Sequence, residues 1–151
     1  MSSTIARNVL IVGASRGLGL EFVRQYRADG AMVTATARAD DGLAAISALG
    51  AKPLKLDVAD AASASGLAWQ IDGESFDTVF YVSGVYGPRT AGMEPPSVDD
   101  FDAVMHTNVL GAMRSRTNAR TASCTARWSS ERYMACLVSL VSGHHASGAP
   151  S

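Results

Sequence analysis

A short apolar run followed by a glycine-rich turn constrains the fold of this chain more than any other feature. The four apolar residues Val9–Val12 predict a fully buried strand, and glycines follow at positions 13, 17 and 19. The segment after the glycines predicts an amphipathic helix, whose apolar face contains Leu18, Phe22, Val23 and Tyr26. This succession brings backbone N–H groups and a positive helix end to a phosphate. An ordinary turn before a core helix is the alternative.

The three glycines have separate expected roles. Gly13 permits a tight turn, Gly17 lets the backbone approach a pyrophosphate, and Gly19 lets the helix pack close to the strand. Their spacing is Gly13-x-x-x-Gly17-x-Gly19 rather than G-x-G-x-x-G.

Further strands and helices alternate along the first part of the chain. Strands are expected at 31–37, 53–56 and 76–82, and helices at 40–49, 61–71 and 97–112. Asp40 or Asp41 is a candidate cap for the second helix, and Leu67, Trp69 and Ile71 are expected to supply apolar bulk in the third. Right-handed crossovers then predict an α/β fold with a Rossmann-type, doubly wound parallel sheet. In it, Val9–Val12 lies between Val33–Ala37 and Val79–Val82, with Leu54–Leu56 outermost.

The turn resembles that of the short-chain dehydrogenase/reductase family, whose first turn reads G-x-x-x-G-x-G. The resemblance runs from Val9 to Arg114. It implies a cofactor turn, an Asp-Val pair against an adenine ring, the end of an Asn-Asn-Ala-Gly motif, and the asparagine of a catalytic tetrad. The matching residues are, in that order, Gly13, Ser15, Arg16, Gly17, Leu18 and Gly19; Asp57 and Val58; Ser83 and Gly84; and Asn108.

The resemblance has departures and alternatives. Tyr81 and Val82 stand where the family has two asparagines. Asp57 could instead cap a helix, and Asn108 could be an ordinary polar residue on a helix surface. The segment Gly84–Thr90 resembles the corresponding sequence of the subgroup that contains C-factor and the sniffer-type carbonyl reductases.

The residues after the second strand favour NADP over NAD. An acidic residue at that position would bind the ribose hydroxyls of NAD, but the chain has Ala37 followed by Arg38. Arg38 and Arg16 offer two guanidinium groups, which suit a 2′-phosphate. Two solvated surface arginines are the alternative.

The family's proton-transfer chemistry is not matched. It needs a tyrosine with a lysine four residues later, because an unassisted tyrosine titrates near 10. The chain's lysines are Lys52 and Lys55, and Tyr133 is followed four places later by Leu137. Ser139 or Ser142 is a weak candidate for the catalytic serine. The expected function is an NADP-dependent oxidoreductase of carbonyls or alcohols that is catalytically incompetent as this chain. The alternatives are a non-catalytic dinucleotide-binding pseudoenzyme, a signalling protein or a frameshifted fragment.

Composition changes near residue 113. Residues 1–113 hold 8 basic and 13 acidic side chains, whereas residues 114–151 hold five arginines and Glu131. We expect an NAD(P)-binding domain over 1–113, truncated after the Asn-Val helix, and a poorly packed tail over 114–151 that arose by frameshift. Tyr133–Val141 alone has enough apolar surface for an added strand or short helix. The altered helix leaves homo-oligomer formation in doubt.

Several other classes of function are disfavoured. A net charge of −1 gives no field for nucleic acid, and the apolar runs are shorter than the roughly 18 residues of a membrane helix. Two cysteines, Cys124 and Cys136, without a signal peptide favour the cytoplasm. No metal site is expected, because the adjacent His144 and His145 do not match a zinc spacing.

Overall fold

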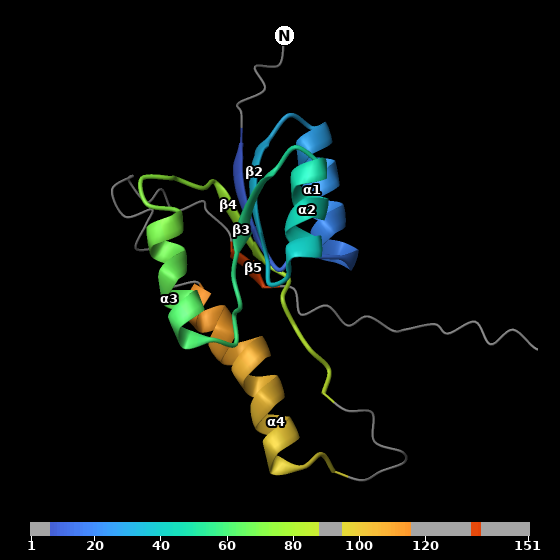
Figure 1. The fold of residues 1–151 in the computed structure, drawn as a ribbon, viewed down its shortest axis with the longest axis vertical. Helices are drawn as coiled ribbons and strands as arrows, with labels where there is room; N and C mark the ends of the chain where they lie inside the picture. The colour runs from blue at the N-terminus through green and yellow to red at the C-terminus, as the bar shows by residue number, and fades with distance from the viewer. Residues whose placement is uncertain (1–6, 88–94, 116–133, 137–151) are drawn as a thin grey trace, which may run out of the picture.

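The computed structural model describes residues 7–87, 95–115 and 134–136, with a five-stranded parallel sheet and helices on both of its faces (Figure 1). In chain order the elements are β1 Asn8–Val12, α1 Gly17–Ala28, β2 Met32–Ala37, α2 Asp40–Ala48, β3 Lys52–Lys55, α3 Ala61–Gln70, β4 Thr78–Tyr81, α4 Val98–Met105, the π-helical turn η1 His106–Leu110, and β5 Met134–Cys136. The predicted doubly wound α/β class is confirmed.

The strand order is β3-β2-β1-β4-β5. All four pairings are parallel, and Val12 lies opposite both Thr36 of β2 and Tyr81 of β4. The order predicted for the first four strands is therefore confirmed. β5 pairs with β4 and fits the added strand that the sequence allows within Tyr133–Val141. The region 114–151 is otherwise described only at Arg114 and Ser115, and its other residues lie outside the described ranges.

β1 forms the centre of the core because its side chains serve both faces of the sheet. Val9 and Ile11 pack toward α1 and α2, whereas Leu10 and Val12 pack toward α3 and the helix that contains Ala112. All four side chains are buried. Figure 1 shows α1 and α2 covering one face, with α3 and α4 on the other. A continuous apolar run is what a strand buried on both faces requires.

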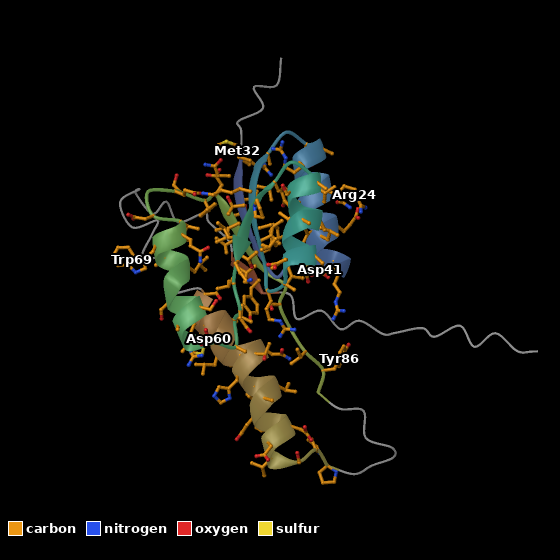
Figure 2. The ribbon with its side chains drawn as sticks, in the orientation of Figure 1. Arg24, Met32, Asp41, Asp60, Trp69 and Tyr86 are labelled. Atoms are coloured by element: carbon orange, nitrogen blue, oxygen red, sulfur yellow. The ribbon has the colours of Figure 1, made fainter. Side chains whose placement is uncertain are left out.

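Two details of the helices differ from expectation. Asp40 and Asp41 lie in the first turn of α2, and the N-cap is Ala39, so neither aspartate caps the helix as predicted. Trp69 is 84% exposed and points away from the sheet (Figure 2), so it supplies no core bulk. Leu67 and Ile71 are four residues apart and occupy the buried face of α3, which leaves Trp69 on the opposite side.

Side chains fix the starts of two other helices. The Asp60 carboxylate accepts hydrogen bonds from the backbone N–H groups of Ala62 and Ser63 at the start of α3. Ser97 Oγ accepts one from Asp100 at the start of α4. No helix in the described ranges is long and apolar enough to cross a membrane.

Candidate functional site

The carboxyl ends of β1 to β4 lie at the same edge of the sheet, and the predicted site residues follow these ends. Because the strands are parallel and adjacent, their carboxyl ends converge there. The glycine turn follows β1, Arg38 follows β2, Asp57 and Val58 follow β3, and Ser83 and Gly84 follow β4. In open α/β sheets this edge is where ligands bind.

Gly13 makes the tight turn at the end of β1. Its φ of 91° lies in the left-handed region, and a Cβ built on it would lie 2.6 Å from the backbone nitrogen of Ser83. Both the backbone conformation and the closeness of the chain after β4 therefore require glycine here. Ser83 is thus placed against the glycine turn by packing, although the two residues are far apart in sequence.

Thr36 holds this turn, and sequence reasoning missed it. The backbone N–H of Gly13 donates to Thr36 Oγ1 at 3.1 Å, and that of Ala14 donates to the Thr36 carbonyl oxygen at 2.8 Å. Thr36 is 1% exposed. The sequence does contain one indication of this role: Thr36 carries a hydroxyl group and lies near the end of a strand that is expected to pair with β1.

Gly17 and Gly19 make room for different neighbours. Gly17 is the first residue of α1, has a φ of 57°, and is exposed with no atom within 4 Å of an added Cβ. A Cβ on Gly19 would overlap the carbonyl oxygen of Gly13 and lie 3.0 Å from Ala14 Cα. Gly17 thus leaves the helix start open, and Gly19 allows α1 to approach the turn.

The remaining residues of the turn leave the positive end of α1 accessible. Ser15 and Arg16 are exposed, and Leu18 is half-buried against the core on the α1 side. Arg16 is the N-cap residue, makes no capping hydrogen bond through its side chain, and is followed by a first turn without acidic residues. The first N–H groups of a helix with such a start favour an anion.

Arg38 follows β2 directly and is exposed, one residue beyond the buried Ala37. The acidic residue next along the chain, Asp40, pairs with Lys55 Nζ at 3.1 Å. Gly42, another residue that sequence reasoning missed, brings α2 against the glycine turn: an added Cβ would lie 2.7 Å from Ser15 Cβ. The start of α2 is therefore packed beside the start of α1.

Asp57 and Val58 follow β3 in a tight turn. Asp57 Oδ1 accepts a hydrogen bond from the Ala59 N–H at 3.0 Å, and its own N–H donates to Ser63 Oγ at 2.9 Å. Val58 is buried in the core. Asp57 stabilises the turn before α3 but is not the cap of that helix, which is Asp60.

Tyr81 takes up the space between β4 and the helix after it. It is fully buried, and its hydroxyl donates to the Thr107 carbonyl oxygen at 2.7 Å. Gly111 passes so close that an added Cβ would lie 2.8 Å from the hydroxyl oxygen. Tyr81 thus joins the end of β4 to η1 at a position where the family has asparagine.

Asn108 lies in the π-helical turn η1 and binds the chain that leaves β4. Its Oδ1 accepts from the Val85 N–H, and its Nδ2 donates to the Val85 carbonyl oxygen, both at 2.8 Å. Such turns occur often at functional sites. Both side-chain groups of Asn108 are engaged with one backbone residue, so the side chain fixes the segment after Ser83 and Gly84.

Lys55 is the last residue of β3 and therefore reaches this edge, whereas Lys52 lies at the opposite end of the strand. Lys52 pairs with Glu74, and Lys55 pairs with Asp40, as given above. The described ranges contain no group of three or more His, Cys, Asp or Glu residues that could hold a metal ion. Candidates outside the described residues are Cys124, Tyr133, Ser139, Ser142, His144 and His145.

The arrangement matches solved structures. A protein of Burkholderia multivorans described as a short-chain dehydrogenase/reductase with bound NADP is 31% identical, with a TM-score of 0.70, over 78% of this chain and 54% of that one. A Serratia marcescens short-chain dehydrogenase/reductase variant is 27% identical (TM-score 0.64, 77% and 50%). BdcA in complex with NADPH is 25% identical (TM-score 0.64, 77% and 47%).

The chain spans about half the length of these relatives. No curated protein matches it significantly. A family model for short chain dehydrogenases matches residues 7–123, which is most of the chain. This chain therefore belongs to the short-chain dehydrogenase/reductase family.

Proposed function

We propose that this chain binds NADP(H) at the carboxyl edge of its sheet and derives from an oxidoreductase of carbonyls or alcohols. The observation that carries the proposal is the glycine turn, whose open side at Gly17 meets an uncapped helix start. A dinucleotide pyrophosphate is the anion that such a strand–turn–helix unit binds.

The preference for NADP(H) rests on the charges next to this turn. Arg38 and Arg16 are exposed, whereas the end of β2 carries Ala37 in place of an acidic residue. The carboxylate of Asp40 is paired with Lys55. Guanidinium groups bind phosphate with charge-assisted hydrogen bonds. The NADP of the Burkholderia multivorans protein and the NADPH of BdcA support the same preference.

Isothermal titration calorimetry with NADPH and NADH tests the proposal. The purified 151-residue chain should bind NADPH more tightly than NADH, because NADPH alone carries the 2′-phosphate. Equal affinities would refute the preference, and no binding of either dinucleotide would refute the site itself.

The second candidate function is that of a dinucleotide-binding protein without turnover. Its support is the absence of a Tyr-x-x-x-Lys pair from the 151 residues, in which the lysines are Lys52 and Lys55. Both belong to β3, and their amines are paired with Glu74 and Asp40. Neither lysine is therefore placed to lower the pKa of a proton-donating tyrosine.

The finer assignments are part of the proposal. Residues 1–113 form the dinucleotide-binding domain, and the segment Gly84–Thr90 relates the chain to the C-factor and sniffer-type carbonyl reductases. Of this segment, residues 84–87 are described, and Asn108 holds their start through Val85. An NADPH-binding chain with no turnover would support the second candidate, whereas turnover would support a working reductase.

A further inference from the structure

We propose that Thr36 is a positioning residue that sets the glycine turn for the pyrophosphate of the dinucleotide. This inference rests on the proposed function, since it concerns the same ligand. It assigns the shape of the turn to a side chain on the neighbouring strand as well as to the glycines.

Thr36 is placed for this role by the sheet register. It lies opposite Val12, the last residue of β1, so its hydroxyl and carbonyl oxygens meet the next two residues of the chain. Gly13 donates to Thr36 Oγ1 at 3.1 Å, and Ala14 donates to the Thr36 carbonyl oxygen at 2.8 Å. The two consecutive N–H groups are thus bound by one residue that is 1% exposed.

This hydrogen bond has no substitute among the described side chains. Thr36 Oγ1 is the one side-chain acceptor there for a backbone N–H of the turn 13–19. Ser83 closes the other side of Gly13 by packing against its Cα without accepting from its N–H. Removal of the hydroxyl therefore leaves the Gly13 N–H without its partner, at the point where the chain reverses with a φ of 91°.

Thr36 also lies two residues before Arg38, the residue proposed to bind the 2′-phosphate. Removal of the Thr36 hydroxyl should weaken the binding of both dinucleotides, because both carry the pyrophosphate. Removal of the Arg38 guanidinium group should weaken the binding of NADPH alone. The ratio of the two affinities therefore separates a positioning role in the turn from a direct role at the 2′-phosphate.

The test compares Thr36→Val, which keeps the shape and removes the hydroxyl, with Thr36→Ser, which keeps the hydroxyl. Thr36→Val should raise the dissociation constants of NADPH and NADH by the same factor, roughly 2- to 12-fold for one hydrogen bond. Thr36→Ser should stay near the parent chain. This rescue by the conservative variant would not follow from a loss of packing, since serine lacks the methyl group.

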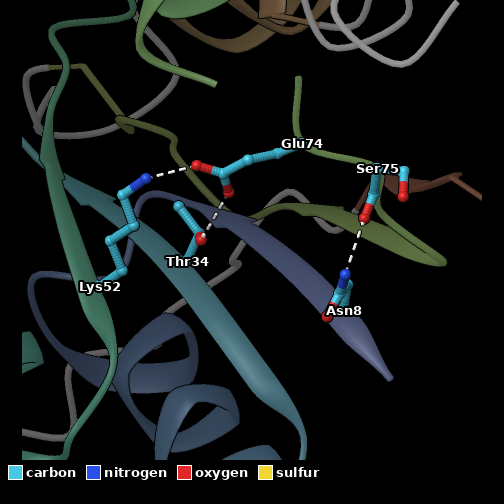
Figure 3. Close-up of polar contacts among 5 residues, drawn as sticks. All are labelled: Asn8, Thr34, Lys52, Glu74 and Ser75. Atoms are coloured by element: carbon cyan, nitrogen blue, oxygen red, sulfur yellow. Dashed lines mark hydrogen bonds and ion pairs between the residues drawn. The ribbon is translucent and has the colours of Figure 1, made fainter. Parts of the chain in front are cut away.

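Thr34→Val is the matched control. Thr34 belongs to the same strand, is also buried, and its hydroxyl donates to Glu74 at 3.4 Å, away from the glycine turn (Figure 3). Glu74 keeps its ion pair with Lys52 when this hydroxyl is removed. Thr34→Val should leave both dissociation constants unchanged.

Amide hydrogen exchange measures the turn without any ligand. In Thr36→Val the Gly13 amide should exchange faster than in the parent chain, whereas the Ala14 amide, bound to the main chain of Thr36, should change less. Parent-like exchange at Gly13 would overturn the inference. Unchanged binding by Thr36→Val, in a parent chain that binds dinucleotide, would overturn the inference alone. A parent chain that binds neither dinucleotide would overturn the proposed function, and with it the role of Thr36 in binding.

Discussion

At the scale of single residues, three glycines of one turn are needed for three different reasons. Gly13 needs its left-handed φ and the space taken by Ser83, Gly17 leaves an open surface, and Gly19 touches the Gly13 carbonyl group. Substitutions at these positions should therefore affect stability and dinucleotide binding in different ways, even though each removes a glycine.

Gly19→Ala should destabilise the chain by about 1–3 kcal/mol, as overpacking does, and weaken NADPH binding because α1 must move from the turn. Gly66→Ala is the control: Gly66 is also helical, but nothing lies within 4 Å of an added Cβ. It should be neutral, or stabilising by up to about 1 kcal/mol, since alanine favours helix. Urea unfolding measures both, and equal effects at the two positions would contradict the packing assigned to Gly19.

Arg38→Ala should weaken NADPH binding and leave NADH binding unchanged. One charge-assisted hydrogen bond contributes about 1.5–3 kcal/mol, so its loss corresponds to roughly 10- to 150-fold in affinity. Calorimetry measures the affinities of Arg38→Ala for NADPH and NADH. Arg24→Ala is the control, because Arg24 is an exposed arginine of α1 that pairs with Glu21. A similar loss with both dinucleotides, or in both variants, would refute a specific contact with the 2′-phosphate.

At the scale of elements, the end of β4 is fastened to the helix after it by two side chains. Tyr81 donates from β4 to Thr107, and Asn108 binds Val85 from η1. Of these three hydrogen bonds, one runs from the strand to the helix, and the other two join the Asn108 side chain to the N–H and the carbonyl oxygen of Val85. Together they hold the segment after β4 in place without the two asparagines of the family motif.

Tyr81→Phe should destabilise the chain by about 0.5–1.5 kcal/mol, because the Thr107 carbonyl group loses the hydrogen bond from the Tyr81 hydroxyl. The Val85 amide should also exchange faster as η1 loosens. Tyr86→Phe serves as the control, since Tyr86 is 57% exposed, and its effect should stay within about 0.5 kcal/mol. If urea unfolding gives equal values for the two variants, Tyr81 does not fasten the helix.

Local patterns in the sequence were sufficient to predict most of the elements and their order. The apolar run of β1, its glycine turn and the amphipathic α1 are all readable within 20 residues, and crossover rules place the other strands. Contacts between segments that are far apart in the chain could not be predicted from the sequence. The bond from Gly13 to Thr36, the approach of Gly42 to Ser15, and the bond from Tyr81 to Thr107 depend on a register that no local pattern specifies.

The start of one strand and the orientation of one large side chain also differ from the prediction. β3 begins at Lys52, one residue before the expected start, and Pro53 is tolerated because β3 lies at the edge of the described sheet. Trp69 was expected inside on hydrophobicity alone, although its place on α3 turns it outward.

At the scale of the whole molecule, the edge proposed for the dinucleotide is built from elements that the structure describes, whereas the described candidates for proton transfer are engaged in other contacts. Asn108 is engaged with Val85, and the two lysines are in ion pairs. The molecule therefore combines the converging strand ends proposed to bind a cofactor with an asparagine and two lysines that are already engaged in other contacts.

The purified chain should not transfer hydride at an enzyme-like rate. An assay with NADPH and a panel of aldehydes and ketones measures this directly. Gly17→Trp is the control for any residual rate, because its side chain would enter the open space where the pyrophosphate is expected. Turnover that survives repurification and disappears in Gly17→Trp would show that the chain is a working reductase.

The central claim is that the carboxyl edge of the sheet is a dinucleotide site, and an NMR titration of the ¹⁵N-labelled chain with NADPH tests it most directly. We predict saturable shifts at the amides of Gly13–Gly19, Arg38 and Val58. The amino edge, where Asn8 bonds to Ser75 (Figure 3) and to Asp77, should stay unchanged. The absence of saturable shifts, or shifts centred on Asn8 and Asp77, would contradict the claim.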